Sequence, residues 1–232
     1  MWEKSLKKTI YTLNVGNSYP SEITDLTYPL LKEYARKIDA EFYVITERKF
    51  PQHLEVYEKF QIYDLAKEHK NDWNIFFDCD TLIHPDTPDL TIHIDFDTVA
   101  HHGNDMASIR WKYNNPYLLR DGRLIGSCNW CAIASAWCTD LWHPSDLTPD
   151  QIAENIFPIV NELQAGITPI RLIDDYICSL NIARYGLKFT TVAAQFKKMG
   201  MDSANFFFHQ YAIPSEEKVI RLREVIKHWN LS

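Results

Sequence analysis

The fold of this chain is decided by WNIFFDCD, the stretch Trp73–Asp80. Its first five residues form a short, largely apolar run. Such a run is too brief for a buried helix and is typical of a central strand that is covered on both faces. Two aspartates, Asp78 and Asp80, follow at once, where this strand leaves the sheet. Ligands of open α/β sheets bind at this carboxyl edge, so the stretch predicts a binding site as well as a strand.

Strand and helix patterns alternate before this stretch. Residues 8–15 and 41–46 are rich in β-branched and aromatic residues and predict strands. Residues 21–38 and 56–69 carry apolar residues at helical spacing. The first 80 residues therefore predict a βαβαβ unit, within a single α/β, Rossmann-like domain that has a central mixed, mostly parallel sheet flanked by helices.

The second half of the chain has less regular patterns. A polar loop over residues 103–122 suggests ligand-binding groups, and the chain ends in an amphipathic helix over residues 215–229. The other patterns predict short strands at 98–100, 124–125, 130–136 and 189–193, and helices at 151–163 and 174–185.

Composition excludes several classes of protein. The 232 residues are 46% hydrophobic and 24% charged, which is typical of one folded globular domain. A net charge of -7 argues against a nucleic-acid partner, which would need a basic face. No apolar run approaches the roughly 18 residues of a membrane span, and the start lacks a signal-peptide pattern. Five cysteines, an odd number, favour reduced thiols, so we expect a cytoplasmic protein without a transmembrane segment.

Asp78 and Asp80 have the chemistry of a metal site. Two carboxylates that are two positions apart at a bending strand end can present oxygens to a hard cation such as Mn²⁺ or Mg²⁺, which often completes its shell with substrate phosphates. An acidic pair in an ordinary surface turn would show the same pattern. A second pair, Asp95 and Asp97, follows an alternating stretch, which favours a loop before a strand over a metal site.

The stretch from Lys59 to Pro85, with Asp78-Cys79-Asp80 inside it, resembles the nucleotide-sugar-binding half of GT-A glycosyltransferases such as glycogenin and its relatives. The resemblance follows the element order of most of the chain. It implies one GT-A-like domain over residues 1–232, with a nucleotide-binding half at about 1–100 and an acceptor-side half at about 101–232. It also implies that Asp78, Asp80 and His209, which follows three phenylalanines, bind the metal.

The same resemblance implies a donor site. The end of the first strand would bind the nucleoside, and Lys59, on the predicted helix that leads to the Asp78 strand, would lie near the nucleotide or its phosphates. Arg110, in the polar loop, could contact the donor phosphate or sugar hydroxyls. The candidate donor-binding residues are Thr12, Leu13, Asn14, Lys59, Asp78, Cys79, Asp80 and Arg110.

Asp174 and Asp175 open a predicted helix. One carboxylate there is easily a helix cap, which is a structural role. Inverting GT-A enzymes use an acidic residue at the start of such a helix to deprotonate the acceptor hydroxyl, and generally use the second of the pair. Retaining members place an acidic motif in the same region, so both outcomes stay open. For an inverting transfer we favour Asp175 as the catalytic base and Asp174 as the cap.

The functional hypothesis is metal-dependent transfer of a sugar from a nucleotide-diphosphate sugar to a hydroxyl of a glycan or another acceptor. UDP is favoured because it is frequent among metal-dependent relatives, and the cofactor is Mn²⁺ or Mg²⁺. One alternative is a haloacid-dehalogenase-like phosphatase, whose Asp-x-Asp also follows a buried strand and uses its first aspartate as a nucleophile. Another is a non-catalytic domain that binds a nucleotide-sugar or a glycan.

Overall fold

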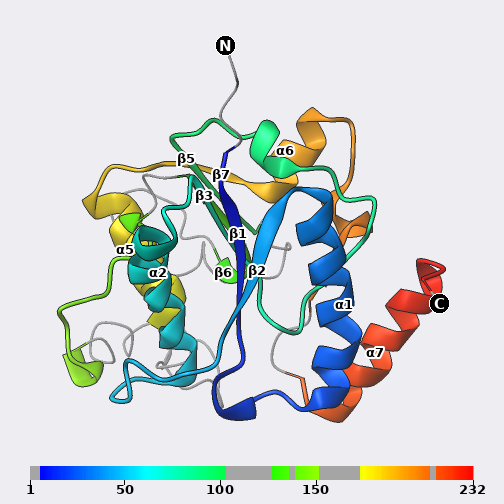
Figure 1. Ribbon diagram of the computed structural model, residues 1–232, viewed down its shortest axis with the longest axis horizontal. Coiled ribbons are helices and arrows are strands. Elements are labelled where there is room, and N and C mark those ends of the chain that lie inside the picture. Colours follow the sequence, from blue (N-terminus) through cyan, green and yellow to red (C-terminus); the bar gives the residue numbers. More distant parts are fainter. Residues whose placement is uncertain (1–5, 103–126, 136–138, 152–172, 210–212, 232) are drawn as a thin grey trace, which may run out of the picture.

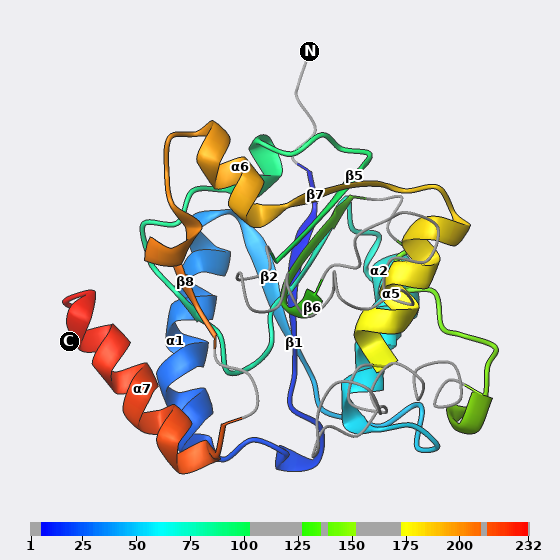
Figure 2. The same ribbon diagram turned by 180° about the vertical axis from the view of Figure 1, so that it is seen from behind.

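The structure is a computed structural model, which describes residues 6–102, 127–135, 139–151, 173–209 and 213–231. These residues form a sheet with helices on both of its faces (Figures 1 and 2). Among them, no helix is long and apolar enough to cross a membrane.

The main sheet is mixed, as predicted. The strand order is β2-β1-β3-β6-β5-β7. β1 is parallel to β2 and β3, and β5 is parallel to β7, whereas β6 is antiparallel to both of its neighbours. The strands are β1 (Lys8–Leu13), β2 (Ala40–Ile45), β3 (Trp73–Phe76), β5 (Thr98–His102), β6 (Ser127–Ser135) and β7 (Lys188–Thr191).

Helices cover both faces of this sheet. α2 and α5 lie on one flank, and α1 and α7 lie side by side on the other (Figures 1 and 2). The helices are α1 (Ser21–Lys37), α2 (Ile62–His69), α5 (Ile173–Arg184), α6 (Val192–Lys198) and α7 (Ser215–His228), with the 3₁₀ turns η1 (Val15–Asn17), η2 (Glu55–Gln61), η3 (Leu90–Ile92) and η7 (Ser203–Asn205).

The core lies on both faces of the central strands. All four residues of β3 are buried, as expected for a strand that is covered on both sides. Ile75 and Phe77 pack with α1 residues in one hydrophobic cluster, whereas Phe76 packs with Phe60 and Trp142 in the other. This alternation fixes the direction in which β3 delivers Asp78 and Asp80 at its end.

A two-stranded sheet completes the arrangement around that end. β4 (Leu82–Ile83) pairs antiparallel with β8 (Phe207–Phe208), with Leu82 opposite Phe208 and Ile83 opposite Phe207. β4 begins two residues after Asp80, and β8 ends one residue before His209. The pairing therefore brings these two parts of the sequence to one place.

Several elements differ from the sequence prediction. The predicted helix over 56–69 is η2 followed by α2. The predicted strand over 189–193 ends at Thr191, whose side chain accepts a 3.0 Å hydrogen bond from the backbone N–H of Ala194 and begins α6. The predicted strand at 124–125 lies outside the described residues, as does nearly all of the predicted helix over 151–163.

Candidate metal centre

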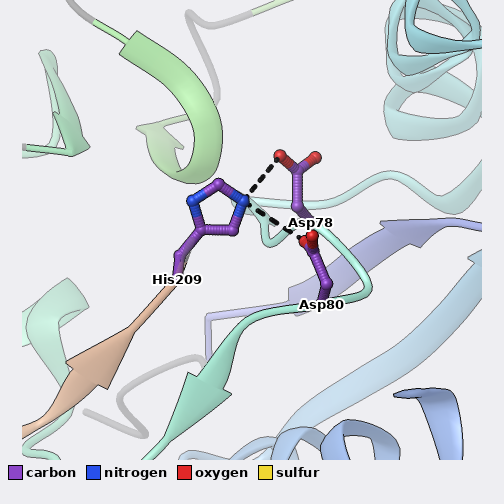
Figure 3. Close-up of side chains that lie close together, drawn as sticks. All are labelled: Asp78, Asp80 and His209. Carbon is purple, nitrogen blue, oxygen red and sulfur yellow. Dashed lines mark ion pairs between the residues drawn. The ribbon is translucent and has the colours of Figure 1, made fainter. Parts of the chain in front are cut away.

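Three potential metal ligands meet at the carboxyl edge of β3. Asp78 and Asp80 lie in the turn after β3, which is closed by a 3.0 Å hydrogen bond from the backbone N–H of Thr81 to the carbonyl of Asp78. His209 comes from the chain just after β8 and points toward both carboxylates (Figure 3). One ligand atom from each of the three side chains lies within 4.8 Å of the others.

The imidazole of His209 faces one oxygen of each aspartate. Its Nε2 lies 3.3 Å from Asp80 Oδ1 and 3.8 Å from Asp78 Oδ2. Asp80 is fully buried, and the side chains of Asp78 and His209 are 18% and 9% exposed. The centre is thus sheltered from water and is open mainly on the Asp78 side.

Two lysines hold the other oxygen of each aspartate. Lys59 Nζ, from η2, lies 3.1 Å from Asp78 Oδ1 and 2.6 Å from Asp174 Oδ2 at the start of α5. Lys218 Nζ, from α7, forms an ion pair with Asp80 Oδ2. Both lysines are buried. Two internal cations therefore compensate the negative charge of the aspartates from opposite flanks of the sheet.

The two aspartates differ in their electrostatic setting. Burial raises the pKa of Asp78 to about 7, because desolvation outweighs the opposing charges of Lys59 and His209. Burial also acts to raise the pKa of Asp80, but His209 and Lys218 outweigh it and hold that pKa below its usual range. Asp80 is thus the aspartate whose ionised form the protein itself stabilises.

The donor set fits a divalent cation. It offers two carboxylate oxygens and one imidazole nitrogen, a combination that suits Mn²⁺ and, through its oxygens, Mg²⁺. Asp80 Oδ1 is buried and faces His209 Nε2 at 3.3 Å. A buried carboxylate is costly in free energy unless its charge is compensated, and a cation bound between Asp78, Asp80 and His209 would add to that compensation.

The end of β1 lies at the same carboxyl edge as this cluster, because β1 and β3 are parallel neighbours. Thr12, Leu13 and Asn14, the predicted nucleoside-binding residues, are all buried there. Thr12 Oγ1 has no hydrogen-bond partner among the described residues, and Asn14 Oδ1 accepts a 3.1 Å hydrogen bond from the backbone N–H of Tyr19.

The remaining sequence-predicted residues occupy different settings. The side chain of Cys79 is buried and its carbonyl accepts a hydrogen bond from Thr27 Oγ1, so Cys79 contributes backbone structure to the turn. Asp174, which we expected to cap the helix, is buried as a counter-ion of Lys59. Asp175 belongs to α5, but the structure does not describe its side chain. Arg110 lies outside the described residues.

The sequence patterns do not predict a role for Lys218 at this centre. Lys218 lies four residues before Leu222 and so shares its face of a helix. The apolar positions of residues 215–229 predict the buried face, and a charged residue is not among them. Asp95 and Asp97, in contrast, are exposed and come directly before β5 as expected, with Asp97 paired to Lys188.

The architecture matches solved glycosyltransferase structures. The chain is similar over 93% of its length, with 11% identity and a TM-score of 0.50, to a glycosyltransferase involved in glycosylation of the major capsid of PBCV-1, of which it covers 99%. The chain has a GT-A fold. At this identity the likeness establishes the fold alone.

Two further matches have lower scores. A mutant Drosophila β1,4-galactosyltransferase 7 in complex with manganese, UDP-Gal and xylobiose is 9% identical, with a TM-score of 0.44 and coverage of 92% of this chain and 79% of that one. A Streptococcus pneumoniae glycosyltransferase is 10% identical, with a TM-score of 0.41 and coverage of 97% and 63%. No protein-family model matches the sequence, and a search of curated proteins finds no significant match.

Proposed function

We propose that this protein is a metal-dependent glycosyltransferase that moves a sugar from a nucleotide-diphosphate sugar to a hydroxyl of a glycan or another acceptor. One observation supports this above all others. In a GT-A fold, Asp78, Asp80 and His209 gather three metal-ligand atoms within 4.8 Å at the carboxyl edge of β3. Ligands of such sheets bind at that edge.

Asp78, Asp80 and His209 would hold Mn²⁺ or Mg²⁺. When bound, the ion stabilises the negative charge that grows on the departing diphosphate. The end of β1 would bind the nucleoside of the donor, through Thr12, Leu13 and Asn14. UDP is the favoured nucleotide because it is frequent among the metal-dependent enzymes that the sequence resembles.

Lys59 has a different part in this proposal from the one that the sequence suggested. Its ammonium is buried between Asp78 and Asp174 and lies 4.8 Å from the centre of the Phe76 ring. It supports the site by holding Asp78 Oδ1, which leaves Asp78 Oδ2 directed toward His209. Asp174 is the second counter-ion of Lys59 and so affects the site through that lysine.

Asp175 is the proposed base of an inverting transfer. It would accept the proton of the acceptor hydroxyl as that oxygen attacks the anomeric carbon of the donor sugar. Asp174 is engaged with Lys59, which supports assigning this role to the second aspartate of the pair. We propose one domain over residues 1–232, in which about 1–100 bind the nucleotide and about 101–232 contribute the acceptor side.

The test is a transfer and hydrolysis assay with UDP-sugars and other nucleotide sugars, with Mn²⁺ and with EDTA. The proposal predicts nucleoside diphosphate release that needs the metal and is lost in Asp80→Asn, whereas His228→Ala, an exposed histidine on α7, keeps it. Metal-dependent binding without release would favour the non-catalytic domain. Hydrolysis of a simple phosphate ester through an aspartyl-phosphate on Asp78 would favour the phosphatase.

A further inference from the structure

Lys218 is a charged side chain on the buried face of α7. It is 6% exposed, and Leu222, one helical turn later, is fully buried against Ile23 of α1 and Leu82 of β4. The Lys218 ammonium also lies 5.2 Å from the centre of the Tyr19 ring. A buried ammonium is very costly in free energy unless it is paired. Its partner is Asp80, so α7 is anchored to the metal centre by this ion pair.

The ion pair divides the two oxygens of Asp80 between two partners. Oδ2 pairs with Lys218, whereas Oδ1 faces His209 at 3.3 Å. The two oxygens of Asp78 also face different partners. Oδ1 lies 3.1 Å from Lys59 Nζ, and Oδ2 lies 3.8 Å from His209 Nε2. Each carboxylate therefore turns a single oxygen toward the centre.

We propose that Lys218 is a positioning residue that holds Asp80 as a one-oxygen ligand and thereby makes the site prefer Mn²⁺ to Ca²⁺. The inference rests on the metal site of the proposed function. Ca²⁺ takes six to eight oxygens and often binds a carboxylate through both of them, whereas smaller ions favour octahedral sites with fewer protein ligands. With Oδ2 held by Lys218, Asp80 offers Ca²⁺ too few oxygens.

The ratio of the Mn²⁺ and Ca²⁺ affinities depends on how the ligands are positioned and not on the charge near the site. Mn²⁺ and Ca²⁺ carry the same charge, so the loss of a nearby ammonium strengthens the Coulomb attraction of the site for both ions alike. The ratio of the two affinities changes only if the ligands that the site offers change. A merely electrostatic role of Lys218 would leave this ratio as it is.

The experiment measures Mn²⁺ binding to the protein without donor by the electron paramagnetic resonance signal of free Mn²⁺, and Ca²⁺ binding by competition. The variants are Lys218→Met, Lys218→Arg and the control Lys227→Met, an exposed lysine on the same helix. We expect Lys218→Met to lower the ratio of Mn²⁺ affinity to Ca²⁺ affinity by roughly 10- to 100-fold, the usual effect on metal binding of losing a group that orients a ligand. Ca²⁺ should gain relative to Mn²⁺, because Asp80 can then offer it both oxygens. Lys218→Arg and Lys227→Met should keep the preference.

An equal change of both affinities in Lys218→Met would overturn the proposal and leave the metal site standing. If the wild type binds no Mn²⁺, the metal site itself is refuted, and with it the proposed metal-dependent activity. If Lys218→Met does not fold, the Mn²⁺ and Ca²⁺ affinities of the wild type and of Lys218→Arg still test the proposal. Equal wild-type affinities for Mn²⁺ and Ca²⁺, or an arginine variant that loses the preference while it keeps its fold, would contradict the role of Lys218.

Discussion

Replacement of Asp80 by asparagine should affect both stability and metal binding, and a second substitution can separate the two. Asp80 is fully buried and pairs with Lys218, which is itself 6% exposed. Asparagine keeps the shape of the side chain but removes its charge. The Lys218 ammonium then stays buried without its counter-ion.

Removal of one partner from a buried ion pair costs about 3–5 kcal/mol, whereas replacement of both partners by residues of similar volume is often close to neutral. Asp80→Asn should therefore lower the free energy of unfolding by about 3–5 kcal/mol. The double variant Asp80→Asn/Lys218→Met should recover most of that loss. Neither variant should bind Mn²⁺, because both lack the buried carboxylate that the centre needs.

Urea unfolding of both variants and of the wild type gives the stabilities, and calorimetric titration with Mn²⁺ gives the binding. The reasoning fails if Asp80→Asn is as stable as the wild type, because Lys218 would then not depend on Asp80. It also fails if the double variant is folded and binds Mn²⁺ with wild-type affinity. In that case the cluster of Asp78, Asp80 and His209 would not be the metal site.

The other predictions concern single side chains around the same centre. His209→Ala should weaken Mn²⁺ affinity in calorimetry with little change of melting temperature, unlike the control His228→Ala, and a large loss of melting temperature at normal affinity would assign His209 a structural role. Lys59→Met should lower the free energy of unfolding by about 3–5 kcal/mol, because it removes the buried ammonium that pairs with buried Asp174 at 2.6 Å, and a wild-type urea midpoint would contradict that pairing. Asp175→Asn should slow turnover at saturating donor and acceptor by about 10²- to 10⁴-fold, and near-normal turnover would exclude Asp175 as the base.

The sequence was sufficient for the first half of the fold because its signals are local. The run from Trp73 to Phe77 has to be a covered strand, since it is short, apolar and followed by charged residues. The carboxyl edge of that strand then places Asp78 and Asp80 without any knowledge of the other elements. These inferences need only the period of the strand and the connection rules of α/β sheets.

The rest depends on pairings between distant residues. β6 runs antiparallel between β3 and β5, and nothing in the sequence of β6 specifies these neighbours. β4 and β8 have two residues each and pair across more than a hundred positions, too short for a propensity signal. The arrival of His209 beside Asp80 depends on that pairing. From the local sequence alone His209 would be a core histidine, and its place in the predicted site came from the family resemblance.

Lys59 and Lys218 show a second limit of sequence reasoning. Most lysines are solvated, so a lysine in a helical pattern is normally assigned to the exposed face. Both of these are buried because an aspartate of the centre meets each of them. A buried charge becomes predictable only when its partner is known, and here the partners lie 19 and 138 positions away.

The most direct test of the metal centre is pulsed electron paramagnetic resonance of Mn²⁺ bound to the protein together with UDP. The account predicts a ¹⁴N coupling from the imidazole of His209, which disappears in His209→Ala and remains in His228→Ala, and a ³¹P coupling from the diphosphate. A bound Mn²⁺ without a nitrogen coupling in the wild type, or with one that survives in His209→Ala, would contradict the account.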